Sequence, residues 1–231
     1  MNKFLADSGV TSRRKAEELI KDGRVSVNDK VVIELSTKIN TNTDFVSLDG
    51  ELIKPKKHVY FLLNKPRGVV TTTSDEKNRK TVVDLVKSNE RIYPVGRLDY
   101  NTTGVLFLTN DGEFANFLTH PSNKVPREYD VKLDKPLTDH DESNLLNGLI
   151  VDGTKSRFTK IQFRNKKDKR FVRVTGIEGK NHYVKKMFGA LGYQVLSLNR
   201  VSFAGVTVDL PAGSYKKLSR TIIDEIYQKY A

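Results

Sequence analysis

Two side chains in one short segment have the charge and reactivity that chemistry needs. Residues 94–104 read Pro-Val-Gly-Arg-Leu-Asp-Tyr-Asn-Thr-Thr-Gly, and the apolar run Val105–Thr109 follows at once. Glycine, asparagine and threonine are typical of loops, whereas a short β-branched and apolar run that ends in a turn predicts a buried strand. A loop held at one end by a strand can present Asp99 as nucleophile, base or electrostatic stabiliser, and Arg97 as a positive charge. From the spacing alone, Asp99 is also explained as a turn residue that caps a nearby amide.

The composition limits the kinds of protein that this chain can be. Its 231 residues fit one large domain or two small ones, and 11 Phe and 9 Tyr supply core material. The absence of cysteine excludes disulfides and thiolate metal sites, and the four histidines show no ligand spacing, so we expect no metal. No run of 18 apolar residues occurs and the N-terminus does not read as a secretory signal, so we expect a cytoplasmic protein without a membrane span.

The charge is strongly and unevenly basic. The formal net charge is +12 with a pI near 9.7, which indicates a polyanionic partner such as nucleic acid or an anionic membrane. Residues 155–186 carry twelve Lys and Arg against two acids, whereas residues 1–57 carry eleven bases and nine acids. Within residues 155–186 the basic residues alternate with apolar residues, as in strands that have one packed face and one face toward phosphate. A plainly solvated face is the alternative.

The pattern of the first 57 residues predicts a small separate module. We expect helices over Asn2–Ser8 and Arg13–Asp22, the second capped by Ser12, followed by a hairpin over residues 24–33. The polar stretch 49–57 contains a proline and is the best linker candidate. The predicted domains are therefore 1–57 and 58–231.

The pattern of the rest of the chain predicts a succession of strands and helices. The expected strands are Val59–Leu63, Val69–Thr73, Val105–Thr109, Val125–Leu133 and several in 150–175; the expected helices are Thr81–Val86, Glu113–Thr119, Pro136–Leu149 and the apolar face within 184–191.

The loop around Asp99 carries a resemblance to a known family. Gly96-Arg-Leu-Asp99, then Thr103-Gly104, an apolar strand and Thr109-Asn-Asp-Gly112, resembles the signature of the pseudouridine synthases that modify ribosomal RNA. The resemblance implies that Asp99 is the catalytic carboxylate of an isomerase of the intramolecular transferase type. In that reaction the bond between the ribose and a nitrogen of the uracil is replaced by a bond between the ribose and carbon 5 of the same uracil. Such a reaction is redox-neutral and adds nothing, so no cofactor, metal or energy source is expected.

Further motifs of that family occur in the expected order, and the resemblance implies an α+β fold with a mixed, mainly antiparallel sheet flanked by helices. Tyr129, in the segment Val125–Leu133, matches the family's tyrosine that stacks on the target base, and stacking is worth about 1–3 kcal/mol. The stretch 177–192 is similar to the family's third motif, which implies that Lys185 pairs with Asp99, although many relatives have arginine there. Leu198 matches a leucine that packs under the base, and Arg97 would hold the loop or a phosphate. Ordinary core positions are the alternatives for Tyr129 and Leu198.

The N-terminal module resembles the RNA-binding domain named after a small-subunit ribosomal protein, through residues 9–20 and 23–28. Basic residues there and in the turn 64–68 and the third motif would contact RNA, with solvated positions as the alternative. These expected RNA contacts are Arg13, Arg14, Lys15, Arg24, Lys65, Arg67 and Lys186.

The resemblance implies a cytoplasmic, monomeric enzyme whose partner is ribosomal RNA or a ribosomal subunit precursor, and whose target uridine leaves the RNA stack. The Ser-Arg-Arg-x-Ala-Glu-Glu run beginning at Ser12 favours a large-subunit target, whereas the His-Tyr-Val-Lys-Lys run beginning at His182 suits the small-subunit branch. Two alternatives remain: an inactive rRNA-binding assembly factor, and a glycosidic hydrolase, which usually needs two facing carboxylates.

Overall fold

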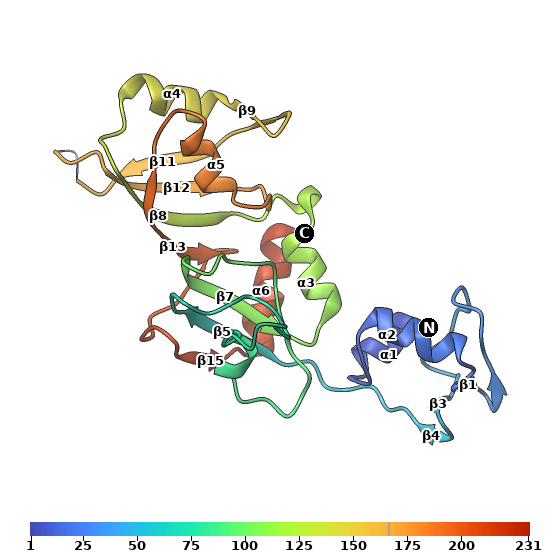
Figure 1. Ribbon diagram of the computed structural model, residues 1–231. Helices are drawn as coiled ribbons and strands as arrows, with labels where there is room; N and C mark the ends of the chain where they lie inside the picture. The colour runs from blue at the N-terminus through green and yellow to red at the C-terminus, as the bar shows by residue number, and fades with distance from the viewer. Residues whose placement is uncertain (166) are drawn as a thin grey trace. The chain divides into compact units, whose positions relative to one another are not determined.

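The computed structural model describes residues 1–165 and 167–231, which fall into two compact units (Figure 1). The smaller unit consists mainly of Met1–Val59, and the larger unit contains most of the chain that follows.

The smaller unit packs two helices against a short antiparallel sheet. Helices α1 (Asn2–Asp7) and α2 (Arg13–Lys21) come first, and the Ser12 hydroxyl accepts a hydrogen bond from the Lys15 amide at the start of α2 (3.3 Å). The sheet order is β2-β1-β3-β4, with bounds β1 (Val25–Val27), β2 (Lys30–Val31), β3 (Val46–Leu48) and β4 (Glu51–Leu52). Leu5, Ile20, Val25 and Val46 form the buried core, so the predicted pair of helices and the hairpin are confirmed.

The larger unit is built on a nine-stranded sheet with the order β11-β12-β8-β13-β7-β5-β15, to which β14 adds on β13 and β6 on β7. Its strands are β5 (Tyr60–Lys65), β6 (Tyr93–Pro94), β7 (Thr103–Thr109), β8 (Arg127–Leu133), β11 (Lys160–Phe163), β12 (Phe171–Gly176), β13 (Val195–Phe203), β14 (Val206–Thr207) and β15 (Tyr215–Lys217). Within the described residues β7 and β13 form the one parallel pair of this sheet. The expected mixed, mainly antiparallel sheet is therefore confirmed.

Helices cover the sheet in two groups, each with its own core (Figure 1). Near β7 the core gathers Phe107, Phe114 and Phe203, and near β8 it gathers Met187 and Phe188. The first group of helices is α3 (Gly112–Thr119) and α6 (Arg220–Tyr230); the second is α4 (Asp139–Asn147) and α5 (Tyr183–Gly189), beside the hairpin β9 (Leu149–Val151) and β10 (Thr154–Ser156). Two 3-10 turns complete the elements, η1 (Val83–Leu85) and η2 (Pro121–Asn123).

The expected strand Val69–Thr73 is wrong. Val70 makes a single bridge with Thr81, and the rest of the segment is irregular. The reason is that β5, the strand before it, is already paired by β7 on one side and β15 on the other. The run that follows β5 therefore finds no unpaired side of that strand to pair with.

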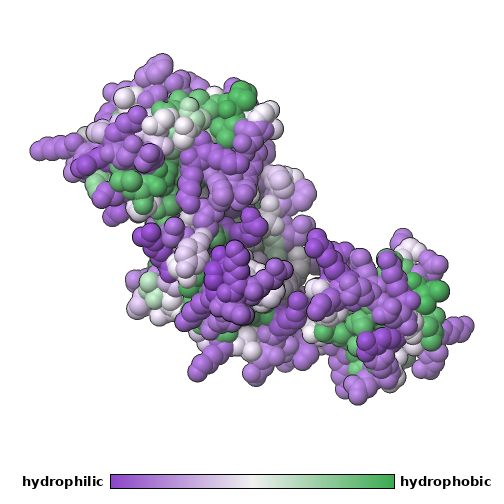
Figure 2. Space-filling model, in the orientation of Figure 1, coloured by the Kyte–Doolittle hydropathy of each residue, from purple (hydrophilic) through white to green (hydrophobic). Residues whose placement is uncertain are grey.

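Hydrophilic side chains cover most of the visible face of each unit, and hydrophobic ones appear as separate patches (Figure 2). No helix among the described residues has the length and apolar content that crossing a bilayer requires.

Candidate active site

The loop that carries Asp99 connects β6 to β7 and is fixed by a buried lysine at the end of β5. The ammonium of Lys65 donates to the backbone carbonyls of Pro66 (3.0 Å), Asp99 (3.2 Å), Tyr100 (3.5 Å) and Thr102 (3.0 Å). The residue is 0% exposed, and this burial lowers the pKa of Lys65 to about 8, although the Asp99 charge acts in the opposite direction. The expected RNA contact of Lys65 is therefore corrected: its side chain cannot reach solvent, and it positions the backbone of Asp99.

Three further bonds hold the same loop. The Thr71 hydroxyl donates to the Leu98 carbonyl (2.7 Å), and the Gly68 amide donates to the Tyr100 carbonyl (2.9 Å). Within the loop, the Thr102 amide donates to the Asp99 carbonyl (3.0 Å). The backbone on both sides of Asp99 is thus fixed before any ligand arrives, which is the condition for a precisely placed reactive group.

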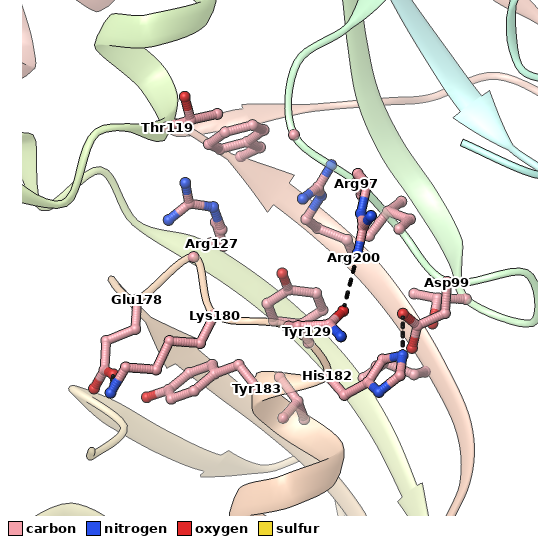
Figure 3. Close-up of a pocket in the computed structure, with 18 of the residues that line it drawn as sticks. Arg97, Asp99, Thr119, Arg127, Tyr129, Glu178, Lys180, His182, Tyr183 and Arg200 are labelled. Atoms are coloured by element: carbon pink, nitrogen blue, oxygen red, sulfur yellow. Dashed lines mark hydrogen bonds and ion pairs between the residues drawn. The ribbon is translucent and has the colours of Figure 1, made fainter. Parts of the chain in front are cut away.

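The Asp99 carboxylate lies between two basic side chains at the start of α5. Lys185 Nζ is 2.6 Å from Oδ2. His182 Nε2 is 3.2 Å from Oδ1, and Figure 3 shows this contact. The Asp99 side chain is 25% exposed, so a ligand can reach it. The pair with Lys185 joins residues 86 positions apart and places a positive charge directly against the carboxylate.

This carboxylate borders a cavity of about 350 Å³. Tyr129 on β8 and Leu198 on β13 line it, and Arg97 lines it from the loop, where it donates to the Asn181 side chain (3.2 Å) (Figure 3). An aromatic ring and a leucine beside one carboxylate suit a planar ring that must be held while a bond next to it is attacked.

The close approach of β7 and β13 brings these residues together. Gly104 has a φ of +105°, and a Cβ built on it would lie 2.1 Å from the Arg200 carbonyl oxygen. Next to it, the Thr103 hydroxyl donates to the Asn199 side chain (2.8 Å). Only glycine allows this contact, which explains why the loop motif ends in Gly104.

The sequence reasoning missed three residues of this site. The spacing of the histidines indicates only whether they could bind a metal, so the position of His182 beside the Asp99 carboxylate was not predicted. Arg127 and Arg200 also line the cavity and are buried, 6% and 2% exposed. Each is a single basic residue inside a strand, so neither periodicity nor a local motif marks it. No group of three or more acidic or histidine side chains that could hold a metal occurs within residues 1–165 and 167–231.

The other expected RNA contacts lie at the surface of their own units. In the larger unit, Arg67 donates to the Asn101 side chain (3.1 Å) and Lys186 pairs with Asp152. In the smaller unit, Arg24 pairs with Asp49 (2.5 Å), whereas exposed positions at the start of α2 hold the remaining three, Arg13, Arg14 and Lys15.

Together, the sheet and its loop place one carboxylate, an aromatic ring and a leucine around a single cavity, as in an enzyme site for a small ring-bearing group. The family model for RNA pseudouridylate synthase matches residues 59–190, and the S4 domain model matches residues 2–44. The chain therefore belongs to the RNA pseudouridylate synthase family and is an isomerase.

Named relatives extend over most of the chain. It is 43% identical over 208 residues to the ribosomal large subunit pseudouridine synthase B of Bacillus subtilis, which covers 88% of this chain and 85% of the relative. It is 34% identical to the dual-specificity RNA pseudouridine synthase RluF of Salmonella typhi, across 99% of this chain and 78% of the relative. A crystal structure of a pseudouridylate synthase superposes with a TM-score of 0.69 at 29% identity, covering 97% of this chain and 98% of that one.

Proposed function

We propose that this protein isomerises one specific uridine of large-subunit ribosomal RNA to pseudouridine, with Asp99 as the catalytic residue. The observation that carries the proposal is the Asp99 carboxylate, held by Lys185 at 2.6 Å at the border of a cavity lined by Tyr129 and Leu198. The similarity to a large-subunit synthase supports the choice of subunit, for which the sequence motifs pointed both ways.

In this proposal the target uridine leaves the RNA stack and its base lies against Tyr129, with Leu198 as a second apolar contact. Asp99 attacks the anomeric carbon of the ribose or assists the departure of the base. Lys185 holds the carboxylate in position, and the detached base then bonds to the ribose through its carbon 5. The exchange of one ribose bond for another needs no outside reagent.

The smaller unit supplies RNA affinity. The exposed Arg13, Arg14 and Lys15 at the start of α2 would contact phosphates, which position a protein without reading sequence. We place the activity in the cytoplasm, on ribosomal RNA or a subunit precursor, with the protein acting as a monomer.

The geometry favours isomerisation over hydrolysis. Glu178 is the second carboxylate that lines the cavity, but it pairs with Lys180 (2.7 Å) and accepts from the Ser156 hydroxyl (2.9 Å). A hydrolase of the two-carboxylate type would need this group free to face Asp99.

Mapping pseudouridines in ribosomal RNA from a strain that lacks this gene tests the proposal. One large-subunit uridine should stay unmodified, and the purified protein should modify it in a transcript. An unchanged map in both subunits, together with no product from the transcript, would support the inactive assembly factor instead.

A further inference from the structure

Two buried arginines in the cavity carry no matching negative charge. Arg127 and Arg200 each lie with the guanidinium carbon 4.7 Å from the centre of the Phe203 ring. No carboxylate within residues 1–165 and 167–231 forms an ion pair with either of them. Burying a charge without a partner is costly, so such a pair calls for a structural or a functional reason.

The hydrogen bonds give Arg127 a structural reason. Its guanidinium donates to the backbone carbonyls of Leu118 (2.9 Å), Val125 (3.2 Å) and Ile177 (3.3 Å). These bonds join three separate segments of the larger unit. Burial lowers the pKa of Arg127 to about 10, so the group is still charged at neutral pH.

Arg200 lacks such a set of acceptors. Its Nε donates to the Val105 carbonyl (2.7 Å) and its guanidinium interacts with the Tyr129 hydroxyl, but Nη2 is buried and has no acceptor in the described part of the chain. A buried guanidinium nitrogen without an acceptor is rare, because it has given up its water without replacement. The group therefore has donor capacity left for a ligand.

Arg200 is also placed where a base would lie. It pairs in register with Tyr129 across β13 and β8, and it follows Leu198 by two residues on the same strand. All three residues line the cavity that Asp99 borders. A base held at Tyr129 with its ribose at Asp99 would therefore share this cavity with the guanidinium, the only type of side chain in the described lining besides lysine that carries a permanent positive charge for a carbonyl oxygen.

We propose that Arg200 is a second catalytic residue, which stabilises the negative charge on the detached uracil. The inference rests on the proposed function. When the bond between the ribose carbon and N1 breaks, its electron pair stays on N1 and spreads onto the two carbonyl oxygens. The bond from carbon 5 to ribose then forms, the proton on carbon 5 leaves, and N1 takes up a proton, so atoms and charge balance.

The test compares two leaving groups in one RNA. A fragment of the mapped target carries either uridine or 5-fluorouridine at the modified position, since fluorine withdraws electrons and stabilises the base anion by itself. Single-turnover rates of loss of the original nucleoside are measured for the wild type, R200Q, R200K and, as a matched control, R220Q. Arg220 lies on α6 and pairs with Asp224.

R200Q should slow cleavage of uridine about 10²-fold, as loss of a charge-stabilising donor does, and cleavage of 5-fluorouridine only about tenfold. The rates of R200K should lie between those of the wild type and those of R200Q, and R220Q should change neither rate. Equal slowing of both substrates, or none, would overturn the inference, and R200K allows the same comparison of the two substrates if R200Q does not fold. A wild type without activity on any ribosomal RNA would overturn the proposed function, and this inference with it.

Discussion

Replacing Lys65 with methionine separates the stability of the fold from the alignment of Asp99. The substitution keeps most of the buried stem and removes the ammonium that donates to four loop carbonyls. Two of these carbonyls keep another donor, since the Thr102 amide bonds Asp99 and the Gly68 amide bonds Tyr100. Up to two carbonyls lose theirs, at a cost of about 1–3 kcal/mol each.

A second effect opposes this loss of stability. Burial lowers the pKa of Lys65 from 10.5 to about 8. At about 1.4 kcal/mol per pKa unit, holding the charged ammonium inside the fold costs roughly 3 kcal/mol, and the neutral methionine avoids this cost. The two effects nearly cancel, so the free energy of unfolding should change by less than about 3 kcal/mol. The loop, however, loses its anchor, and a small displacement of Asp99 should lower kcat about 10²-fold.

Urea unfolding and single-turnover pseudouridine formation, measured on the same K65M preparation, test this separation. A kcat of K65M within about threefold of the wild-type value would show that Lys65 does not align the loop. Loss of stability and activity in proportion would show that it acts on the fold alone.

The same lysine predicts a pH effect with a definite sign. Because the pKa of Lys65 is lower in the folded chain, the unfolded chain binds more protons between about pH 8 and pH 10.5, and stability from this group rises with pH in that window. The wild type should gain about 2 kcal/mol over K65M between about pH 7.5 and about pH 9.5. An unchanged difference in urea unfolding would mean that Lys65 is not held charged in a desolvated site.

Two further substitutions test the cavity and the strand contact behind it. Y129A should lower kcat/KM about 10–100-fold through lost stacking, whereas Y129F should stay within a few-fold; equal loss in both would assign the effect to the hydroxyl. G104A should lower the melting temperature strongly, because its Cβ would lie 2.1 Å from the Arg200 carbonyl, whereas G189A, with nothing within 4 Å, should not; similar melting of the two would contradict the close approach.

The sequence was sufficient for most helices and strands, because hydrophobic periodicity and turn residues are local signals. The fold class came from the family resemblance. Helix α2 is an example, since Ser12 marks its start and an apolar face runs along it. The strand expected at Val69–Thr73 failed because the pairing of β5 by β7 and β15 is a property of the whole sheet. A local pattern cannot show whether a sheet edge is free.

The same distinction separates the site residues. Asp99 lies in a long continuous motif, so its position could be inferred before any geometry was known. The roles of Lys65 and Arg200 depend on partners 34 and 95 positions away, the Asp99 and Val105 carbonyls, and on burial inside the unit. A basic residue in a turn or strand usually indicates a solvated surface, and only the packing shows that these two are enclosed.

The most direct test of the central claim measures catalysis and binding together for D99N. The substitution removes the carboxylate charge that Lys185 and His182 face while keeping the size of the side chain. We predict no detectable pseudouridine at the mapped position, RNA affinity within about twofold of the wild type because phosphate contacts supply most of it, and full activity for the control D224N. Substantial turnover by D99N would contradict the account.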